Sequence, residues 1–377
     1  MRQRNPSKRA RNQNRTREST PRRPTASNRA VTSPIIREIL ARIRTASFQH
    51  YLKKLLVELC RIDTTPSSVV EKMRLAEDGC FQILERELGA LNFSGARLER
   101  RPINPAIKTH PNYSLLHFTK TPERPQGLST EETYANRSNL LCMLPGAVKS
   151  STGQSVAINA HVDVVAPYFP PRVKGGMVYG CGACDDKSSV VSMVAALKVL
   201  SEVMAKAGLK WNRNVLAMFV VEEETGGNGS LSLAMDRDLK RFYDSILVGE
   251  CTGLKFHPAN RGAVWYRADL TVPTGVSPVE MFAFVNEEME KEGAAVHAES
   301  RHIFFPQRPV QTCHGIIGSF GEHPSRICGE VSFLVQSERR PDEPTENLVR
   351  DCLEAGLASY MVAGQYCQLV ASGIKRS

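Results

Sequence analysis

The amino-acid sequence predicts an α/β protein, with a doubly wound sheet within residues 35–263 and a ferredoxin-like βαββαβ domain over residues 264–374. Three short, continuous apolar runs after residue 154 are typical of buried parallel strands. A helical repeat of apolar residues separates the first two runs, which is the alternation that a doubly wound sheet requires. Strand and helix patterns then alternate in the order β-α-β-β-α-β up to the C-terminal region.

Residues 1–34 differ from the rest of the chain in charge. They hold ten basic side chains and one acid, Glu18, so they carry +9 of the net charge of +10. They lack aromatic residues and almost lack large aliphatic ones, so we expect a disordered basic tail. A solvated extension is the simpler interpretation, and an arm that binds nucleic acid through phosphate contacts is the alternative.

The next elements are helical. Apolar residues at helical spacing predict helices over residues 35–63 and 69–91, and residues 104–135 are predicted to form a long surface loop. No uninterrupted apolar run approaches 18 residues, which predicts that no segment spans a membrane. The ten scattered cysteines indicate reduced thiols in a cytoplasmic protein, and for the Cys181/Cys184 pair a redox role is the minor alternative.

Each of the three apolar runs ends in residues that can bind a metal. Ser155–Ala160 leads to His161 and Asp163, Asn214–Val221 leads to Glu222, Glu223 and Glu224, and Ser245–Gly249 leads to Glu250. A helix is predicted over residues 187–207, with Asp185 or Asp186 as its N-cap. Ligands of open α/β sheets lie at the carboxyl ends of the strands. Several acids and a histidine at one edge need a counter-charge, which a divalent metal supplies.

Any one of these motifs is weak, because acids at strand ends usually face water. Four motifs in order, each at a strand end or in the loop beside one, favour a functional interpretation. At this point the sequence resembles the M20 family of metallopeptidases and amidohydrolases, which includes acetylornithine deacetylases, succinyl-diaminopimelate desuccinylases and glutamate carboxypeptidases. The matching stretches are His161–Val165, Tyr179–Lys187, Glu222–Ser230 and Val248–Thr252.

The resemblance implies a two-zinc centre, with Co²⁺ or Mn²⁺ as alternative metals. It implies that His161 and Glu250 bind one zinc, Glu224 binds the second, and Asp185 bridges both. It assigns Glu223 as general base and acid, and Asp163 as the residue that orients His161. A zinc-activated water and a glutamate base are suited to hydrolysing the amide bond of an N-acyl amino acid or small peptide.

The resemblance also implies that residues 264–374 are a lid or dimerisation domain inserted in the catalytic domain. Family lids usually carry a substrate-binding histidine after a glycine near the first strand's end, where this chain has Thr274–Pro278. His302, His314 and His323 are the candidate substitutes.

In members of the family, the chain returns from the lid to the catalytic domain and supplies a late histidine to the second zinc. This sequence ends at Ser377. The second site is therefore expected to be incomplete. Three hypotheses follow: a zinc-dependent amidohydrolase or exopeptidase, a non-catalytic relative that binds metal and a peptide or amino acid, and a nucleic-acid-binding arm on an incidental body. The expected partners are a small substrate and a second copy bound through the lid.

Overall fold

The computed structural model describes residues 33–91, 93–121, 123–147, 155–255, 264–271, 277–299, 311–318, 330–337, 343–362 and 375–376. The chain divides into two compact units, Met1–Cys251 and Thr252–Ser377. The sequence-based domain boundary lay at 263/264, twelve residues further on, and residues 256–263 between the two positions lie outside the described part. The predicted disordered tail likewise lies outside it, except for Ser33 and Pro34.

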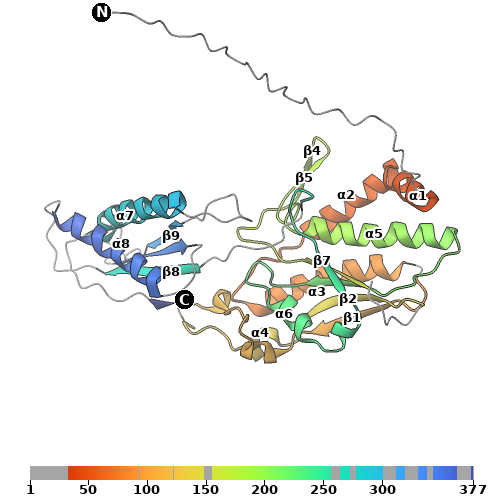
Figure 1. Ribbon diagram of the computed structural model, residues 1–377, viewed down its shortest axis with the longest axis horizontal. Coiled ribbons are helices and arrows are strands. Elements are labelled where there is room, and N and C mark those ends of the chain that lie inside the picture. The colour runs from red at the N-terminus through yellow and green to blue at the C-terminus, as the bar shows by residue number, and fades with distance from the viewer. Residues whose placement is uncertain are drawn as a thin grey trace, which may run out of the picture. The chain divides into compact units, whose positions relative to one another are not determined.

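The first unit contains a five-stranded sheet of order β1-β2-β6-β3-β7 (Figure 1). Its strands are β1 Arg97–Pro102, β2 Ser138–Leu144, β3 Val156–His161, β6 Val215–Val220 and β7 Ser245–Val248. The three strands expected from the apolar runs, β3, β6 and β7, are parallel as predicted. β1 and β2 were not predicted, and they pair antiparallel, so the sheet is mixed.

Helices cover both faces of this sheet. The helices are α1 Pro34–Ile43, α2 Ala46–Cys60, α3 Val70–Gly89, α4 Thr130–Tyr134, α5 Lys187–Lys206 and α6 Asn228–Met235. Apolar side chains of α2, α3 and α5, such as Leu59, Phe81 and Val194, pack in one core with Leu140 and Phe219 of the sheet. A smaller core is formed by the alternate side chains of the same strands, on the other face of the sheet, and it contains Leu233 of α6. The doubly wound arrangement is thus present around the parallel strands.

The predicted helical region 35–63 is two helices, because the chain turns at Arg44 and Thr45 between α1 and α2. Thr45 caps α2 by accepting a hydrogen bond from the backbone N–H of Phe48. The predicted loop 104–135 contains two short 3₁₀ helices, Pro105–Thr109 and His117–Thr119, and the helix α4. Figure 1 shows this segment beside α6. The segment is therefore structured, and it contributes residues behind the site described below.

Helix α5 is long and apolar enough to cross a membrane, with a mean hydropathy of 1.5 over its best window. Lys198 and Glu202 interrupt its apolar residues, so the absence of a membrane-spanning segment stays a prediction that this helix does not contradict. Half of that window is buried within the protein. Its side chains pack against the sheet and helices α1 and α2, which is the environment of a core helix.

The two edges of the sheet differ in composition. β1 carries Arg97, Glu99, Arg100 and Arg101 and ends at Pro102, and it pairs with β2 on one side. β7 is exposed along its whole length, and its apolar residues Ile246, Leu247 and Val248 are each about half exposed. Among the described residues, β3 is the strand that pairs with β7.

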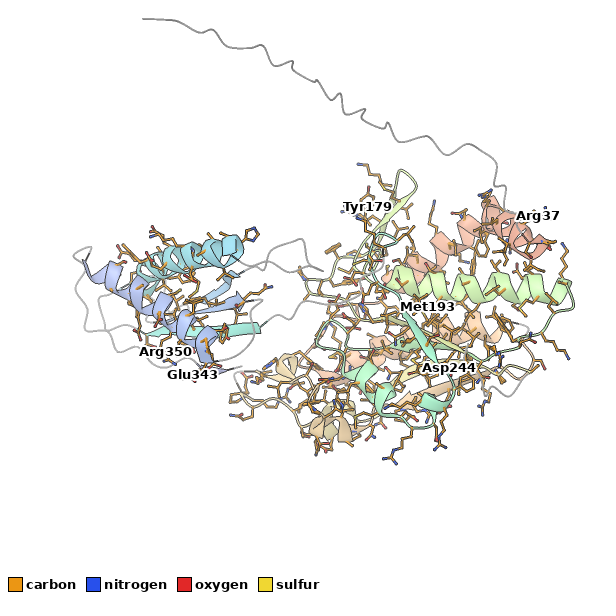
Figure 2. The ribbon with its side chains drawn as sticks, in the orientation of Figure 1. Arg37, Tyr179, Met193, Asp244, Glu343 and Arg350 are labelled. Atoms are coloured by element: carbon orange, nitrogen blue, oxygen red, sulfur yellow. The ribbon has the colours of Figure 1, made fainter. Side chains whose placement is uncertain are left out.

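Two further strands, β4 Arg172–Lys174 and β5 Met177–Tyr179, form a hairpin of their own, and Tyr179 at its end is exposed (Figure 2). A third short 3₁₀ helix, Leu239–Arg241, precedes β7. Residues 179–187 lead from the hairpin into α5, and they carry two of the acids that the sequence marked out.

The second unit has the predicted element order β8 Val264–Thr271, α7 Pro278–Glu299, β9 Gln311–Gly318, β10 Glu330–Ser337, α8 Glu343–Val362 and β11 Lys375–Arg376. Its antiparallel sheet has the order β11-β8-β10-β9. Phe282 of α7 and Phe333 of β10 meet edge to face at 4.7 Å in its core. α7 continues through Gly293 to Glu299, and residues 363–374, between α8 and β11, lie outside the described residues.

Candidate metal centre

The parallel strands bring the predicted residues together at their carboxyl ends. His161 is the last residue of β3, Glu222 follows β6 by two residues, and Glu250 follows β7 by two. The His161 ring is buried, with Nε2 3.1 Å from Asp185 Oδ1 and 3.7 Å from Glu223 Oε2. Its other nitrogen, Nδ1, lies 3.3 Å from Asp163 Oδ1 and 3.1 Å from the Asp163 carbonyl oxygen. The ring therefore presents Nε2 to the acids.

Asp163 connects this histidine to the turn after β6. Its Oδ1 accepts a hydrogen bond from the Glu223 backbone N–H at 3.2 Å, and its Oδ2 accepts one from that of Glu224 at 3.0 Å. The same buried carboxylate thus contacts the ring of His161 and fixes two consecutive peptide groups. A carboxylate on the far nitrogen of a ligating histidine fixes the ring's orientation.

Three consecutive glutamates follow β6, and they point in different directions. Glu222 is buried and has a left-handed backbone with φ of 63°, whereas Glu223 is exposed and Glu224 is half-buried. Gly229, in the first turn of α6, packs against this segment. A Cβ at this position would lie 2.2 Å from the carbonyl oxygen of Val221, so glycine is required there.

The loop before α5 brings Asp185 and Asp186 to the same place. Lys187, the first residue of α5, is fully buried and donates to the carbonyl oxygens of Leu59 at 3.2 Å and Ile62 at 2.8 Å. These bonds tie the start of α5 to the end of α2, which fixes the two aspartates before it. Asp186 occupies the N-cap position but makes no side-chain cap; its carboxylate instead accepts from the His161 backbone N–H at 3.4 Å.

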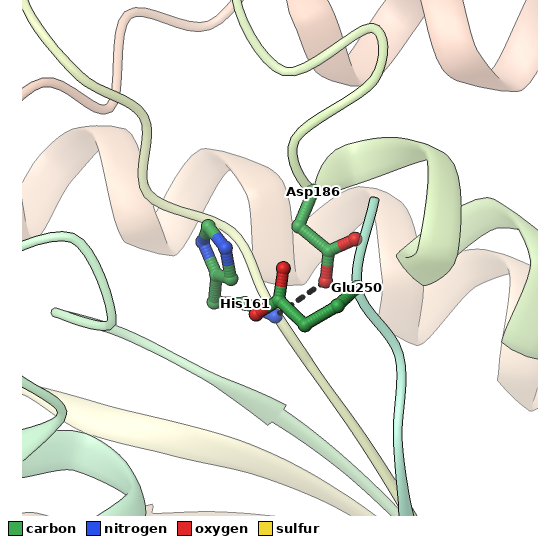
Figure 3. A group of neighbouring side chains, drawn as sticks. All are labelled: His161, Asp186 and Glu250. Carbon is green, nitrogen blue, oxygen red and sulfur yellow. Dashed lines mark hydrogen bonds between the residues drawn. The ribbon is translucent and has the colours of Figure 1, made fainter. Parts of the chain in front are cut away.

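The side chains form three overlapping groups whose ligand atoms lie within 4.8 Å of one another. These are His161, Asp186 and Glu250; His161, Asp185 and Glu224; and Asp185, Glu250 and Cys251. Figure 3 shows the first group, with a dashed line for the hydrogen bond from the His161 backbone N–H to the Asp186 carboxylate. An imidazole nitrogen with several carboxylates suits zinc, cobalt or manganese. The donor set therefore fits a divalent metal.

The pKa shifts of the site residues also favour a cation site. Burial raises the pKa of Asp186 to about 7, and burial together with the charge of Asp185 raises that of Glu224 to about 7. The pKa of Glu223 is also raised, by burial and by the charges of Glu250, Asp163 and Asp185, with His161 opposing. Burial alone would lower the pKa of His161, but the hydrogen bond and charge of Asp163 and the charges of Asp186 and Glu223 raise it to about 10. The mutual repulsion of these carboxylates, which raises their pKa values, is what a bound cation would relieve.

The structure places all six sequence-predicted site residues at one edge of the sheet: His161, Asp163, Asp185, Glu223, Glu224 and Glu250. Sequence reasoning treated Asp186 as a helix cap and passed over Cys251, whose Sγ lies 3.6 Å from Asp185 Oδ2. Adjacency to the predicted ligands was a signal for both. Of the candidate histidines in the second unit, His302 and His323 lie outside the described residues, and only the backbone of His314 is described.

Cys181 and Cys184 are both free thiols, the first buried and the second exposed. Cys181 Sγ accepts from the Phe169 backbone N–H at 3.2 Å. Cys181 is thus packed in the loop, and neither thiol of the pair forms a disulfide in this structure.

Comparison with known proteins finds one matching family profile and several similar proteins. Residues 157–331 match the sequence profile of Peptidase family M20/M25/M40. The chain is 31% identical over 114 residues to a peptidase M20 domain-containing protein of Schizosaccharomyces pombe, a match that covers 30% of this chain and 27% of that protein. It is 22% identical over 304 residues to a succinyl-diaminopimelate desuccinylase of a Polaromonas species, covering 72% and 66% of the two chains.

The fold is similar to that of human carnosine dipeptidase 1, with a TM-score of 0.60 and 15% sequence identity. That similarity covers 91% of this chain and 79% of the dipeptidase. The chain thus spans between about a quarter and two thirds of the length of these two curated relatives.

Proposed function

We propose that this chain, a relative of the M20/M25/M40 peptidase family, is a metal-dependent hydrolase that cleaves amide bonds in N-acyl amino acids or short peptides. The observation that carries the proposal is the convergence of one buried histidine and four carboxylates within two overlapping ligand groups. The substrate class is supported by two proteins that the chain resembles, one named a desuccinylase and the other a dipeptidase. We propose a cytoplasmic location, because the free cysteines suit a reducing compartment.

The proposed metals are two Zn²⁺ ions, with Co²⁺ or Mn²⁺ as alternatives. His161 and Glu250 would hold the first, Glu224 the second, and Asp185 would contact both, because Asp185 belongs to groups that contain Glu224 and Glu250. Asp186, within reach of His161 and Glu250, is available as a further ligand to the first. A bound divalent ion would polarise the scissile carbonyl and lower the pKa of a water molecule.

Glu223 has the position of a general base. Its carboxylate reaches within 3.7 Å of His161 Nε2 and remains about half exposed, so a water molecule can approach it from solvent. Its raised pKa suits it to accept a proton and later donate it to a leaving amine. Asp163 holds the Glu223 peptide and the imidazole of His161 at the same time, so it would orient both.

The second unit has the element order of the predicted lid domain, and we extend the proposal to a lid role and to dimerisation through this unit. The alternative function is metal binding without turnover. It is favoured by the ligands left for the second metal, which among the described residues are Asp185 and Glu224 once the single free nitrogen of His161 serves the first metal. The basic tail as a nucleic-acid-binding arm remains a separate proposal.

The decisive experiment measures bound zinc per chain after purification at limiting zinc, for the wild type and for His161→Ala, Glu224→Ala and Glu223→Gln. We expect about two zinc ions in the wild type and in Glu223→Gln, and about one fewer in each ligand variant. Hydrolysis of dipeptides and N-acyl amino acids should depend on metal and fall by about a hundredfold or more in Glu223→Gln.

Different results would separate the alternatives. About one zinc, unchanged by Glu224→Ala, together with no turnover of any substrate, would support the metal-binding interpretation. Turnover that persists unchanged in Glu223→Gln would contradict the role of Glu223. Arg86→Gln, which alters a surface ion pair with Glu58, is a suitable control and should keep both metal content and activity.

A further inference from the structure

A buried cluster of charged side chains lies directly behind the metal centre. Arg137, between α4 and β2, has a fully buried guanidinium group. Its Nε and Nη2 bond both carboxylate oxygens of Glu77 on α3, at 3.0 and 2.5 Å. Its Nη1 donates to Glu222 Oε1 and, at 3.3 Å, to the Thr133 carbonyl oxygen. One arginine therefore ties a helix to the first of the three glutamates after β6.

Glu222 is held from its other side by Tyr134, which is itself held by Asn228 at the start of α6. The Tyr134 hydroxyl donates to Glu222 Oε2 at 2.5 Å, and Asn228 Nδ2 donates to the Tyr134 oxygen at 2.9 Å. Asn228 also exchanges two hydrogen bonds with the backbone of Ser114. Both carboxylate oxygens of Glu222 are thus engaged within the protein.

The backbone of Glu222 is fixed as well. Its carbonyl oxygen accepts from the Gly227 N–H at 2.7 Å, and the Glu223 carbonyl oxygen accepts from that of Gly226 at 2.9 Å. The left-handed φ of 63° is unusual for a residue with a long side chain and needs surrounding contacts to hold it. With Glu222 pinned inward, the next two residues face the metal centre, and Asp163 accepts hydrogen bonds from their N–H groups.

The cluster is costly in free energy. Two carboxylates and one guanidinium are removed from water, which leaves one uncompensated negative charge if both acids are ionised. Burial raises the pKa of Glu222 and of Glu77, and Arg137 opposes the rise in both. A well-packed apolar cluster of the same size would often be at least as stable. A role in stability alone therefore does not account for charges at this position.

We propose that Glu222, Arg137 and Tyr134 are positioning residues, which set the direction of Glu223 and Glu224 toward the metal centre by holding the turn between them and β6. This inference rests on the proposed function for the roles of Glu223 and Glu224. It extends that function to side chains that contact neither metal nor substrate. Their effect passes through the backbone of Glu222 and is expected to be selective for the metal that Glu224 holds.

The primary test is Tyr134→Phe, which removes one hydroxyl group and keeps the aromatic ring. The centroid of this ring lies 5.4 Å from Cζ of the Arg137 guanidinium. The matched control is Tyr51→Phe, which removes another tyrosine–glutamate hydrogen bond of the same unit, 2.8 Å long, between α2 and α3. Both variants of the full chain are titrated with Zn²⁺ against a chelator to obtain the two dissociation constants. Glu224→Gln identifies which constant belongs to the Glu224 metal.

We expect Tyr134→Phe to weaken the Glu224 metal about tenfold, and to leave the other dissociation constant within twofold, because outer-shell partners of ligands typically contribute this much. Where turnover is measurable, kcat should fall about tenfold with KM within twofold. Glu222→Gln should act in the same direction and more strongly. In a Glu224→Gln background, Tyr134→Phe should have no further effect on metal affinity.

The proposal is overturned if Tyr134→Phe and Tyr51→Phe give the same metal affinities, or if Tyr134→Phe weakens both metals equally, which is what general destabilisation would do. A wild type that binds two metals without turnover would contradict the proposed hydrolase activity, yet the two dissociation constants would still decide the positioning role. Circular dichroism of each variant confirms folding before titration.

Discussion

Two neighbouring layers of the metal centre differ in burial and in hydrogen bonding. The inner layer consists of Glu77, Arg137, Glu222 and Asp163, all buried, with their charged groups bonded to named partners. The outer layer consists of Asp185, Glu223, Glu224 and Glu250, whose side chains are half-buried or exposed. Asp185 lies within ligand distance of both Glu224 and Glu250.

The difference separates two physical tasks. Charges in the inner layer are satisfied within the folded chain, so removing one of them should affect the stability of the fold. Charges in the outer layer repel one another until a cation arrives, so removing one of them should affect ion binding and leave the fold intact. Substitutions that mix these two outcomes would show that the layers are not independent.

The largest effect is expected for Arg137→Met. It leaves Glu77 and Glu222 buried without their cation, so the free energy of unfolding of the first unit should fall by about 3–5 kcal/mol. Urea denaturation followed by circular dichroism measures this. The control is Arg86→Met, whose side chain is 54% exposed and paired with Glu58 and Glu87, with an expected loss under about 1 kcal/mol. Equal losses in the two variants would show that the inner layer does not support the fold.

A smaller, opposite effect is expected for Glu224→Gln. It removes one of several crowded carboxylates, so the metal-free variant should be at least as stable as the metal-free wild type. Its second zinc should bind about 10–100-fold more weakly, which removes part of the zinc-induced rise in Tm and leaves the part due to the first zinc. Differential scanning calorimetry with and without Zn²⁺ measures both quantities. A metal-free variant that unfolds several degrees below the wild type would place Glu224 with the inner layer.

The smallest effect is the pH dependence of the metal-free protein. The pKa values of Glu224 and Asp186 are raised to about 7, so the folded state binds their protons more tightly than the unfolded state. Their contribution to stability therefore falls as pH rises from about 4 to about 7. The raised pKa of His161, about 10, gives a contribution that is complete below about pH 6.5 and lost toward pH 10. We expect the Tm of the metal-free protein to fall by a few degrees between pH 5 and pH 8.

Carboxyls with lowered pKa, such as Glu85 beside Arg100, have already given their full contribution above about pH 5, so they do not mask this trend. Glu224→Gln should make the fall of Tm with rising pH less steep. Zinc should reverse the fall, because metal affinity rises as the ligands lose their protons. A metal-free wild type whose Tm rises over the same pH interval would contradict the assignment of these groups.

The outer layer was largely predictable from the sequence. Parallel strands end at one edge of a sheet, so each acid or histidine that follows an apolar run can be placed without coordinates. The inner layer was not predictable by the same reasoning. Glu222, Glu223 and Glu224 are indistinguishable in a pattern, and the partner that turns Glu222 inward, Arg137, lies 85 residues earlier. Tyr134 stands in a segment without periodicity, whose short helices depend on local capping such as that of Ser129 and Glu132.

The edge strands were missed for a related reason. β1 reads Arg-Leu-Glu-Arg-Arg-Pro, a composition that favours water over a core, and its pairing with β2 is a long-range choice. In the second unit the βαββαβ order could be predicted, because each helix and strand has its own spacing of apolar residues. The role of Asp186 was missed because an aspartate before a helix is usually a cap, and here its carboxylate turns to His161 instead.

The exposed strand β7 has a consequence for how the protein behaves in solution. An apolar edge without charges or proline is a template on which another extended segment can add by main-chain pairing, whereas β1 is guarded by its arginines and Pro102. Glu250 follows β7 by two residues. Strand addition at this edge would therefore restrict the segment after β7 that carries Glu250. The affinity for zinc should then depend on the protein concentration.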